Sequence, residues 1–259
     1  MKQSLRVNRR RFLAIGGFAG AAPLVSAQAP KTKSILITSG GGRLAQALAA
    51  GLKETYSIRL TERAPIRTAH EFVQCALGHD SATDEVVRGV EAIVHVAEPL
   101  PEETPEQQID FLTRCTYNLL WSAAEGKVPR IVLLSTLELM TGYEPSYTVS
   151  ENWLPLPSMT TIVLAKHLGE YISREFAREG KTQIVVLRLG KVVRADEVKD
   201  QPPDPLWVEE RDVVHAVSCA LSAKLNVWQV FHIQSDLPGA RFSVKRAQTA
   251  LGYRPRFRW

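Results

Sequence analysis

The stretch KSILITSGGG, residues 33–42, sets an apolar run directly before three glycines, and a helical pattern begins at Arg43. Gly40, Gly42 and Ala45 fit the dinucleotide fingerprint, in which glycines allow a tight turn and let backbone N–H groups approach a pyrophosphate at the positive end of a helix. The alternative is an ordinary strand-turn-helix connection. On the dinucleotide interpretation, the expected cofactor contacts in this stretch are Ser39, Gly40, Gly41, Gly42, Arg43 and Leu44.

An acidic residue follows the turn at the spacing expected for a ribose ligand. Glu62 lies twenty residues beyond Gly42, at the end of a second apolar run. A carboxylate at this position favours NAD because it would repel the extra phosphate of NADP, whereas the neighbouring Arg63 leaves NADP open. The sequence therefore predicts NAD as the cofactor, with NADP as the alternative.

The first residues carry a separate pattern. Residues 8–13 read NRRRFL, and an uncharged, Gly/Ala-rich segment continues to Ala27. This resembles a twin-arginine export signal, which implies recognition by the twin-arginine export machinery and a periplasmic or secreted location. The small residues favour cleavage before Gln28, with a cut after Ala29 as the alternative. A transmembrane anchor is the other interpretation, but the segment is shorter than the roughly 20 apolar residues that a bilayer needs and contains Pro23.

The excess of positive charge in the sequence lies in that first segment. The sequence has 32 Lys+Arg and 27 Asp+Glu. The five basic residues of the first 30 positions are Lys2, Arg6, Arg9, Arg10 and Arg11, with no acid among them. The rest of the chain is therefore formally neutral and gives no support to nucleic-acid binding.

Cysteine and histidine usage argues against metal and disulfide chemistry. Cys75, Cys115 and Cys219 are scattered at no metal-ligand spacing, and the six histidines are equally dispersed. We therefore expect core thiols and no metal site.

Apolar strands alternate with helical patterns after residue 33, which predicts an α/β fold with a doubly wound parallel sheet, the Rossmann fold. The expected strands cover 34–38, 57–61, 72–75, 92–96, 130–135, 183–188 and 227–233. The expected helices cover 43–53, 83–89, 105–124, 160–178, 211–223 and 244–251. Asp212 is interpreted as the N-cap of the fifth of these helices.

The expected domains follow from these patterns. They are an export signal over 1–27, a linker over 28–32 and a single NAD(P)-binding domain over 33–259, with a small substrate lobe from about 195–210 and 235–259. Loops 142–157 and 195–205 follow strand ends, so we expect them to form the substrate walls.

Several short motifs recur in a characteristic order over nearly all of residues 33–259. Beside the glycine turn and Glu62, they are GVEAIVHVA at 89–97, LST at 134–136, Lys166 with Gly169-Glu170, RLG at 188–190 and LGYRP at 251–255. This order resembles the extended short-chain dehydrogenase/reductases, which include the NAD-dependent epimerases and dehydratases.

The resemblance implies roles for individual residues. His95, Val96 and Ala97 would lie against the cofactor, and Leu189 would complete that site. Thr136 would hydrogen-bond the reacting oxygen, although a hydroxyl that only caps the strand end is the alternative. Lys166 would hold the nicotinamide ribose. The resemblance also implies a homodimer formed through the helices at 105–124 and 160–178.

Departures from the family pattern decide what activity to expect. The resemblance implies Tyr-x-x-x-Lys on one helix face, but residues 162–166 read IVLAK, so Ile162 stands where the catalytic tyrosine is expected. A general acid or base typically contributes about 10² to 10⁴ in rate, so hydride transfer should be slow unless another group substitutes. The candidate substitutes are Glu138, Tyr143 and Tyr147. Ser39 at the first family glycine and Ala76 at the usual adenine-contacting Asp predict modest cofactor affinity.

Three function classes stay open. The first is an exported NAD(P)-binding protein of this family with weak or no standard redox turnover, a pseudoenzyme. The second is an active oxidoreductase or epimerase that uses a non-standard acid on a small carbonyl or sugar-like compound. The third is a structural or interaction domain with a vestigial cofactor site. For the first two, the expected partner is a small-molecule substrate or ligand.

Overall fold

A computed structural model describes residues 33–257. The predicted export signal and linker, 1–32, lie outside the described residues. No helix within 33–257 is both long and apolar enough to cross a membrane.

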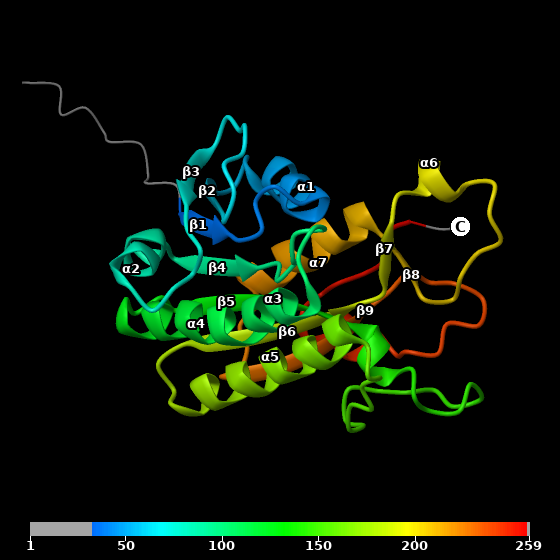
Figure 1. Cartoon of the computed structure of the whole chain (residues 1–259). Helices are drawn as coiled ribbons and strands as arrows, with labels where there is room; N and C mark the ends of the chain where they lie inside the picture. The colour runs from blue at the N-terminus through cyan, green and yellow to red at the C-terminus, as the bar shows by residue number, and fades with distance from the viewer. Residues whose placement is uncertain (1–32, 258–259) are drawn as a thin grey trace, which may run out of the picture. The chain divides into compact units, whose positions relative to one another are not determined.

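Seven parallel strands form the central sheet in the order β3-β2-β1-β4-β5-β6-β9 (Figure 1). Their bounds are β1 Ser34–Ile37, β2 Ser57–Glu62, β3 Glu71–Gln74, β4 Ala92–His95, β5 Arg130–Thr136, β6 Gln183–Leu189 and β9 Trp228–Ile233. All seven agree with the predicted strands to within one residue at each end. The strand order reverses between β1 and β4, and in doubly wound sheets ligands bind outside the carboxyl ends of the strands at that point.

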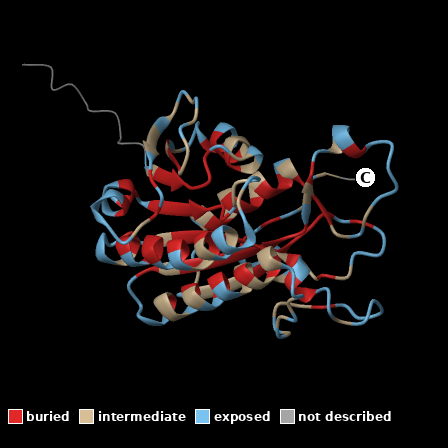
Figure 2. Ribbon diagram, in the orientation of Figure 1, coloured by how far each residue is buried: buried red, intermediate tan, exposed pale blue. Residues whose placement is uncertain are grey.

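Helices cover both faces because the strands are apolar on both. Ile35 and Ile37 of β1 belong to a core with α1 (Arg43–Leu52) and α7 (Glu210–Ser222), whereas Leu36 belongs to a second core with α2 (Ser81–Val87), α4 (Thr116–Glu125) and α5 (Thr161–Arg178). Successive strand residues point to opposite faces, so one apolar strand supplies both cores. Figure 2 shows the buried residues along the strands and on the inner sides of these helices. The doubly wound prediction is confirmed.

The predicted helix at 105–124 consists of three segments. They are α3 (Pro105–Asp110), a π-helical turn η1 (Phe111–Cys115) and α4. Thr104 and Gln107 form a capping box at the start of α3. The extra residue of a π turn shifts the helix face that follows it, and Thr116, the first residue of α4, reaches the ring of His95 on β4.

A small parallel pair of strands lies beyond β6, and the sequence did not predict it. β7 (Lys191–Val193) pairs with β8 (Trp207–Glu209), and α6 (Ala195–Val198) lies in the connection between them. The pair forms where the chain passes closely at Gly190, since a Cβ there would lie 2.2 Å from the carbonyl oxygen of Leu206. The remaining short elements are the 3-10 helix η2 (Leu137–Met140) and α8 (Lys245–Ala250).

Asp212 is not the N-cap of its helix. Glu209 takes that position and accepts a hydrogen bond from the Arg211 N–H, whereas Asp212 lies buried in the first turn of α7. Its carboxylate accepts the backbone N–H groups of Arg256, at 2.8 Å, and Phe257, at 3.2 Å. The prediction was wrong because the N-cap, Glu209, lies three residues before Asp212 and the helix begins at Glu210.

Candidate active site

The glycine turn joins β1 to α1 and packs against β2. The Gly40 N–H donates to the Thr61 carbonyl at 2.9 Å, and a Cβ on Gly40 would lie 3.1 Å from the Leu60 Cβ. Gly42 is the N-cap of α1, and no side chain caps that helix start. The first backbone N–H groups of a helix carry partial positive charge, so this end of α1 favours an anion.

Glu62 lies at this turn, as its spacing predicted. Its side chain is almost fully buried, and one carboxylate oxygen accepts the Gly41 N–H at 3.3 Å while the other accepts the Arg63 N–H at 2.8 Å. The Arg63 guanidinium pairs with Glu103 and lies 3.7 Å above the ring centre of Phe111. The Arg63 guanidinium therefore lies between the carboxylates of Glu62 and Glu103.

Arg63 also borders a hollow of about 410 Å³ at the carboxyl end of β3. Ala76, which stands at the expected adenine-contacting position, lies in its wall, and residues of α3 and η1 form the opposite wall. The hollow begins at Arg63, next to Glu62, so it extends the site away from the glycine turn.

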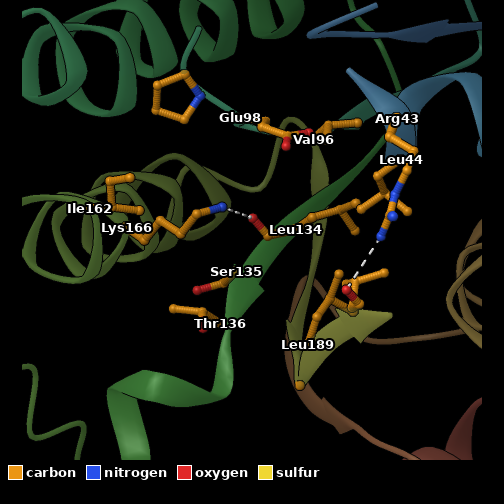
Figure 3. A pocket seen from close by; sticks show the side chains of 13 residues that line it. Arg43, Leu44, Val96, Glu98, Leu134, Ser135, Thr136, Ile162, Lys166 and Leu189 are labelled. Atoms are coloured by element: carbon orange, nitrogen blue, oxygen red, sulfur yellow. Dashed lines mark hydrogen bonds between the residues drawn. The ribbon is translucent and has the colours of Figure 1, made fainter. Parts of the chain in front are cut away.

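The main hollow, of about 330 Å³, opens at the switch point of the sheet (Figure 3). It is lined by the first turn of α1, the ends of β4, β5 and β6, and the start of α5. The lining residues are Arg43, Leu44, Val96, Glu98, Pro99, Leu134, Ser135, Thr136, Ile162, Lys166, Leu189, Gly190 and Val192. Six residues predicted from sequence meet there: Arg43, Leu44, Val96, Thr136, Lys166 and Leu189.

Lys166 points from α5 into this hollow. Its ammonium donates to the carbonyl oxygen of Leu134 at 3.3 Å (Figure 3). Burial of the ammonium lowers the pKa of Lys166 to about 8, although the carboxylates of Glu98, Glu170 and Glu138 oppose that shift. Ile162, one helical turn earlier, lines the same hollow, so an apolar side chain occupies the face where a phenol would stand.

Two hydroxyls at the end of β5 also border the hollow. The Thr136 hydroxyl accepts the Glu138 N–H at 3.1 Å and so caps η2. Its own proton remains available to a ligand because that contact uses the oxygen as acceptor. Ser135 is 4% exposed, and its hydroxyl has no hydrogen-bond partner among the described residues. Buried polar groups are normally hydrogen-bonded, so an unpartnered hydroxyl in a hollow indicates a ligand position.

The ring of His95 lies in the core and not among the residues that line the main hollow. Its ring is buried between Thr38, at 2.8 Å, and Thr116, at 2.9 Å, and burial lowers its pKa to about 3. The neutral ring joins β1, β4 and α4 from inside the core. Of its two neighbours, Val96 lines the hollow and Ala97 is buried beside it.

The candidate replacement acids lie outside the lining. Glu138 is exposed on η2. The Tyr143 hydroxyl donates to the Leu154 carbonyl at 2.6 Å, and both Tyr143 and Tyr147 pack against Trp153. Neither of the predicted wall loops, 142–157 and 195–205, contributes a side chain to the main hollow.

A buried ion pair fixes α5 against the sheet. Glu170 lies one turn beyond Lys166, and its carboxylate accepts from the Arg188 guanidinium of β6 at 2.7 Å. Both side chains are about 5% exposed. The pair therefore sets the height of Lys166 over the strand ends.

Sequence reasoning missed Ser135 and Glu98 as site residues. Ser135 lies beside Thr136 in the quoted LST motif, and Glu98 follows β4 at the switch point. Its position shortly after a buried strand was the sequence feature that could have identified Glu98 as a site residue. Within residues 33–257, no group of three or more His, Cys, Asp or Glu side chains could hold a metal ion.

The fold and this site together define a Rossmann-fold protein with its ligand crevice at the switch point. The chain belongs to the NAD dependent epimerase/dehydratase family, whose model matches residues 35–204.

Individual relatives are distant in sequence but similar over most of their length. The chain is 23% identical over 242 residues to the NAD-dependent glucose-6-phosphate dehydrogenase of Haloferax volcanii, covering 85% of this chain and 92% of that protein. Uronate dehydrogenase from Agrobacterium tumefaciens superposes with a TM-score of 0.76 at 22% identity, covering 87% of this chain and 85% of that one. A form of that enzyme with a tyrosine replaced by alanine, complexed with NAD, gives a TM-score of 0.75 at the same identity and coverage.

Proposed function

We propose that this chain binds NAD in the crevice at the switch point and that its hydride transfer is slow because the phenol is missing. One observation carries the proposal: the main hollow brings the start of α1 and Lys166 together while Ile162 occupies the position of the acid.

The residues present fit the dinucleotide along its length. The glycine turn and the uncapped start of α1 would hold the pyrophosphate, and Glu62 would take the adenosine ribose. The hollow beside Ala76 would take the adenine, and Lys166 the nicotinamide ribose. The two carboxylates around Arg63 favour NAD over NADP because they would repel a ribose phosphate.

Calorimetric titration of NAD, NADH, NADP and NADPH into the purified protein tests this. We expect NAD and NADH to bind in the micromolar range, with binding weakened at least tenfold by Gly42→Val or Lys166→Ala. Lys181→Ala, which removes an exposed lysine at the far end of α5, is the matched control. If none of the four binds, the cofactor site is vestigial and the interaction-domain hypothesis replaces this one.

A second candidate is a working dehydrogenase that uses Lys166 itself as the base. With its pKa near 8, a substantial fraction of Lys166 is the neutral amine at mildly alkaline pH. The neutral amine would take the proton from the substrate hydroxyl, and NAD held by the glycine turn and Glu62 would supply the hydride acceptor. Ser135 and Thr136 would orient that oxygen. The relatives named above act on a sugar phosphate and on uronates, so a small sugar is the substrate class to test.

The two candidates differ in turnover. NADH formation from glucose 6-phosphate or hexuronates should rise with pH through about 8 if the neutral amine is the base. Lys166→Arg keeps a cation that stays protonated, so it should abolish this turnover while retaining cofactor binding. Turnover that survives Lys166→Arg would exclude the lysine as base.

We also propose that residues 1–27 direct export through the twin-arginine route to the periplasm or beyond. The support is the NRRRFL run followed by an uncharged segment. A fusion of residues 1–32 to a reporter that folds in the cytoplasm should be exported. Arg9→Lys with Arg10→Lys should stop it, and Lys2→Arg should not.

A further inference from the structure

A carboxylate lies on the expected phosphate position of the site. A Cβ on Gly42 would lie 2.7 Å from a carboxylate oxygen of Glu98, so that oxygen rests against the start of α1. Glu98 also faces the main hollow, whose lining includes Lys166 (Figure 3). Among the described residues no hydrogen bond or ion pair to the Glu98 carboxylate occurs.

The backbone of Glu98 is fastened to the glycine turn by Ser39. The Ser39 hydroxyl donates to the Glu98 carbonyl oxygen at 3.0 Å and accepts the Glu98 N–H at 3.1 Å. The carboxylate can turn, but the backbone that carries it cannot move away while these two bonds hold.

Ser39 and the residue before Glu98 both have unfavourable backbone conformations. Ser39 adopts a φ of +54°, and Ala97, just before Glu98, adopts a φ of +52°. Both lie in the left-handed region, which non-glycine residues adopt rarely. Ser39 stands where the family pattern has glycine, so this departure from the pattern is in direct contact with Glu98.

We infer that Glu98 is an internal competitor for the phosphate position, which the pyrophosphate of a dinucleotide must displace before it binds. The inference rests on the proposed function because it concerns the affinity of that same site. The start of α1 favours an anion, and a carboxylate oxygen of Glu98 rests against it at Gly42. A diphosphate adds further negative charge to the same position, and the two repel each other unless Glu98 turns toward solvent. Glu98 is therefore an affinity determinant of the site.

The test compares Glu98→Gln, which keeps the shape and removes the charge, with the unchanged protein. NADH binding is followed by fluorescence at about pH 6.5, well below the pKa of about 8 of Lys166, because removing the Glu98 charge lowers that pKa further. We expect Glu98→Gln to bind NADH about tenfold more tightly, which corresponds to about 1.4 kcal/mol. Glu102→Gln is the matched control because Glu102 is an exposed acid of the same loop outside the lining, and it should change the affinity less than twofold.

Two further measurements separate charge from shape. ADP should gain from Glu98→Gln as NADH does, whereas adenosine, which lacks phosphate, should not. Ser39→Gly removes both bonds to the Glu98 backbone at a position whose φ suits glycine. It should tighten NADH binding about twofold to threefold, and adding it to Glu98→Gln should give no further gain, because the two act on one contact.

The outcomes distinguish this inference from the proposed function. If NADH binds the unchanged protein and Glu98→Gln binds it equally or more weakly, the inference is overturned while the cofactor site stands. An equal gain with adenosine would also overturn it, since the effect would then not concern phosphate. If neither protein binds any dinucleotide, the proposed function fails and the inference with it.

Discussion

Lys166 on α5 donates a hydrogen bond to the Leu134 carbonyl oxygen of β5 across 3.3 Å, so the one cation deep in the main hollow, among the described residues, is held by a strand end. Leu134 directly precedes the two hydroxyl residues that border the same hollow. The ammonium and the hydroxyls therefore keep a fixed spacing, because one strand positions all three.

The protonation of Lys166 should govern cofactor affinity. The ammonium form exists below the pKa of about 8 and attracts an anionic ligand, whereas the neutral amine above it does not. NADH affinity should therefore fall as pH rises through about 8. Titrations between roughly pH 6.5 and 9.5 would show a flat profile for Lys166→Met and for Lys166→Arg, which cannot change charge in that range. A slope that persists in Lys166→Met would assign the dependence to another group.

Restoring the phenol should raise turnover. Ile162→Tyr places a hydroxyl one helical turn before Lys166, on the face that lines the hollow. A positioned acid or base contributes about 10² to 10⁴ in rate, so we expect at least a hundredfold gain in any NAD-dependent reduction. Ile162→Phe adds the ring without the hydroxyl and should give none. No gain with tyrosine would mean that the substrate pocket has diverged as well.

Breaking the buried ion pair should destabilise the fold. Glu170→Gln leaves the Arg188 guanidinium without its carboxylate, and such losses typically cost about 3 to 5 kcal/mol. Urea unfolding would measure the change in the free energy of unfolding. Replacing both partners together, Glu170→Leu with Arg188→Met, should cost less than the sum of the single changes. Additive losses would show that the two residues act independently.

The outer faces of α4 and α5 should pair with a second copy of the chain. Tyr117, Trp121 and Tyr171 expose about half of their aromatic surface there, and a hollow of about 350 Å³ lies beside Trp121. The resemblance to the family implies a homodimer through these helices. Light scattering after size exclusion should give about twice 28.8 kDa, and Trp121→Glu should shift it to the monomer. Val227→Glu, an exposed apolar residue elsewhere, should leave the mass unchanged.

The sequence predicted the sheet well because buried parallel strands are continuous apolar runs between turn residues. It did not predict β7 and β8, since three-residue strands such as KVV and WVE leave no measurable pattern. It also could not separate α3 from α4, because residue types alone do not distinguish a single π turn within a continuous helical run.

At the site, motif positions predicted Lys166 and Thr136, but charge alone did not reveal Glu98. A glutamate in a loop is usually solvated, and only the contact with Gly42 shows where its carboxylate lies. Tyr143 and Tyr147 illustrate the reverse case. Their nearness in sequence to Thr136 suggested a place over the crevice, whereas aromatic packing on Trp153 draws both rings elsewhere.

The wall of the main hollow is collected from five separate stretches between residues 43 and 192. No fragment of the chain contains more than part of it, so the hollow exists only when the whole sheet is assembled. Any ligand held there binds the native state and not the unfolded chain, and at a hundred times its Kd it adds about 2.7 kcal/mol to the free energy of unfolding. Ligand concentration and resistance to unfolding are thus linked by mass action, and the melting temperature of this protein becomes a measure of how much of its ligand the surroundings contain.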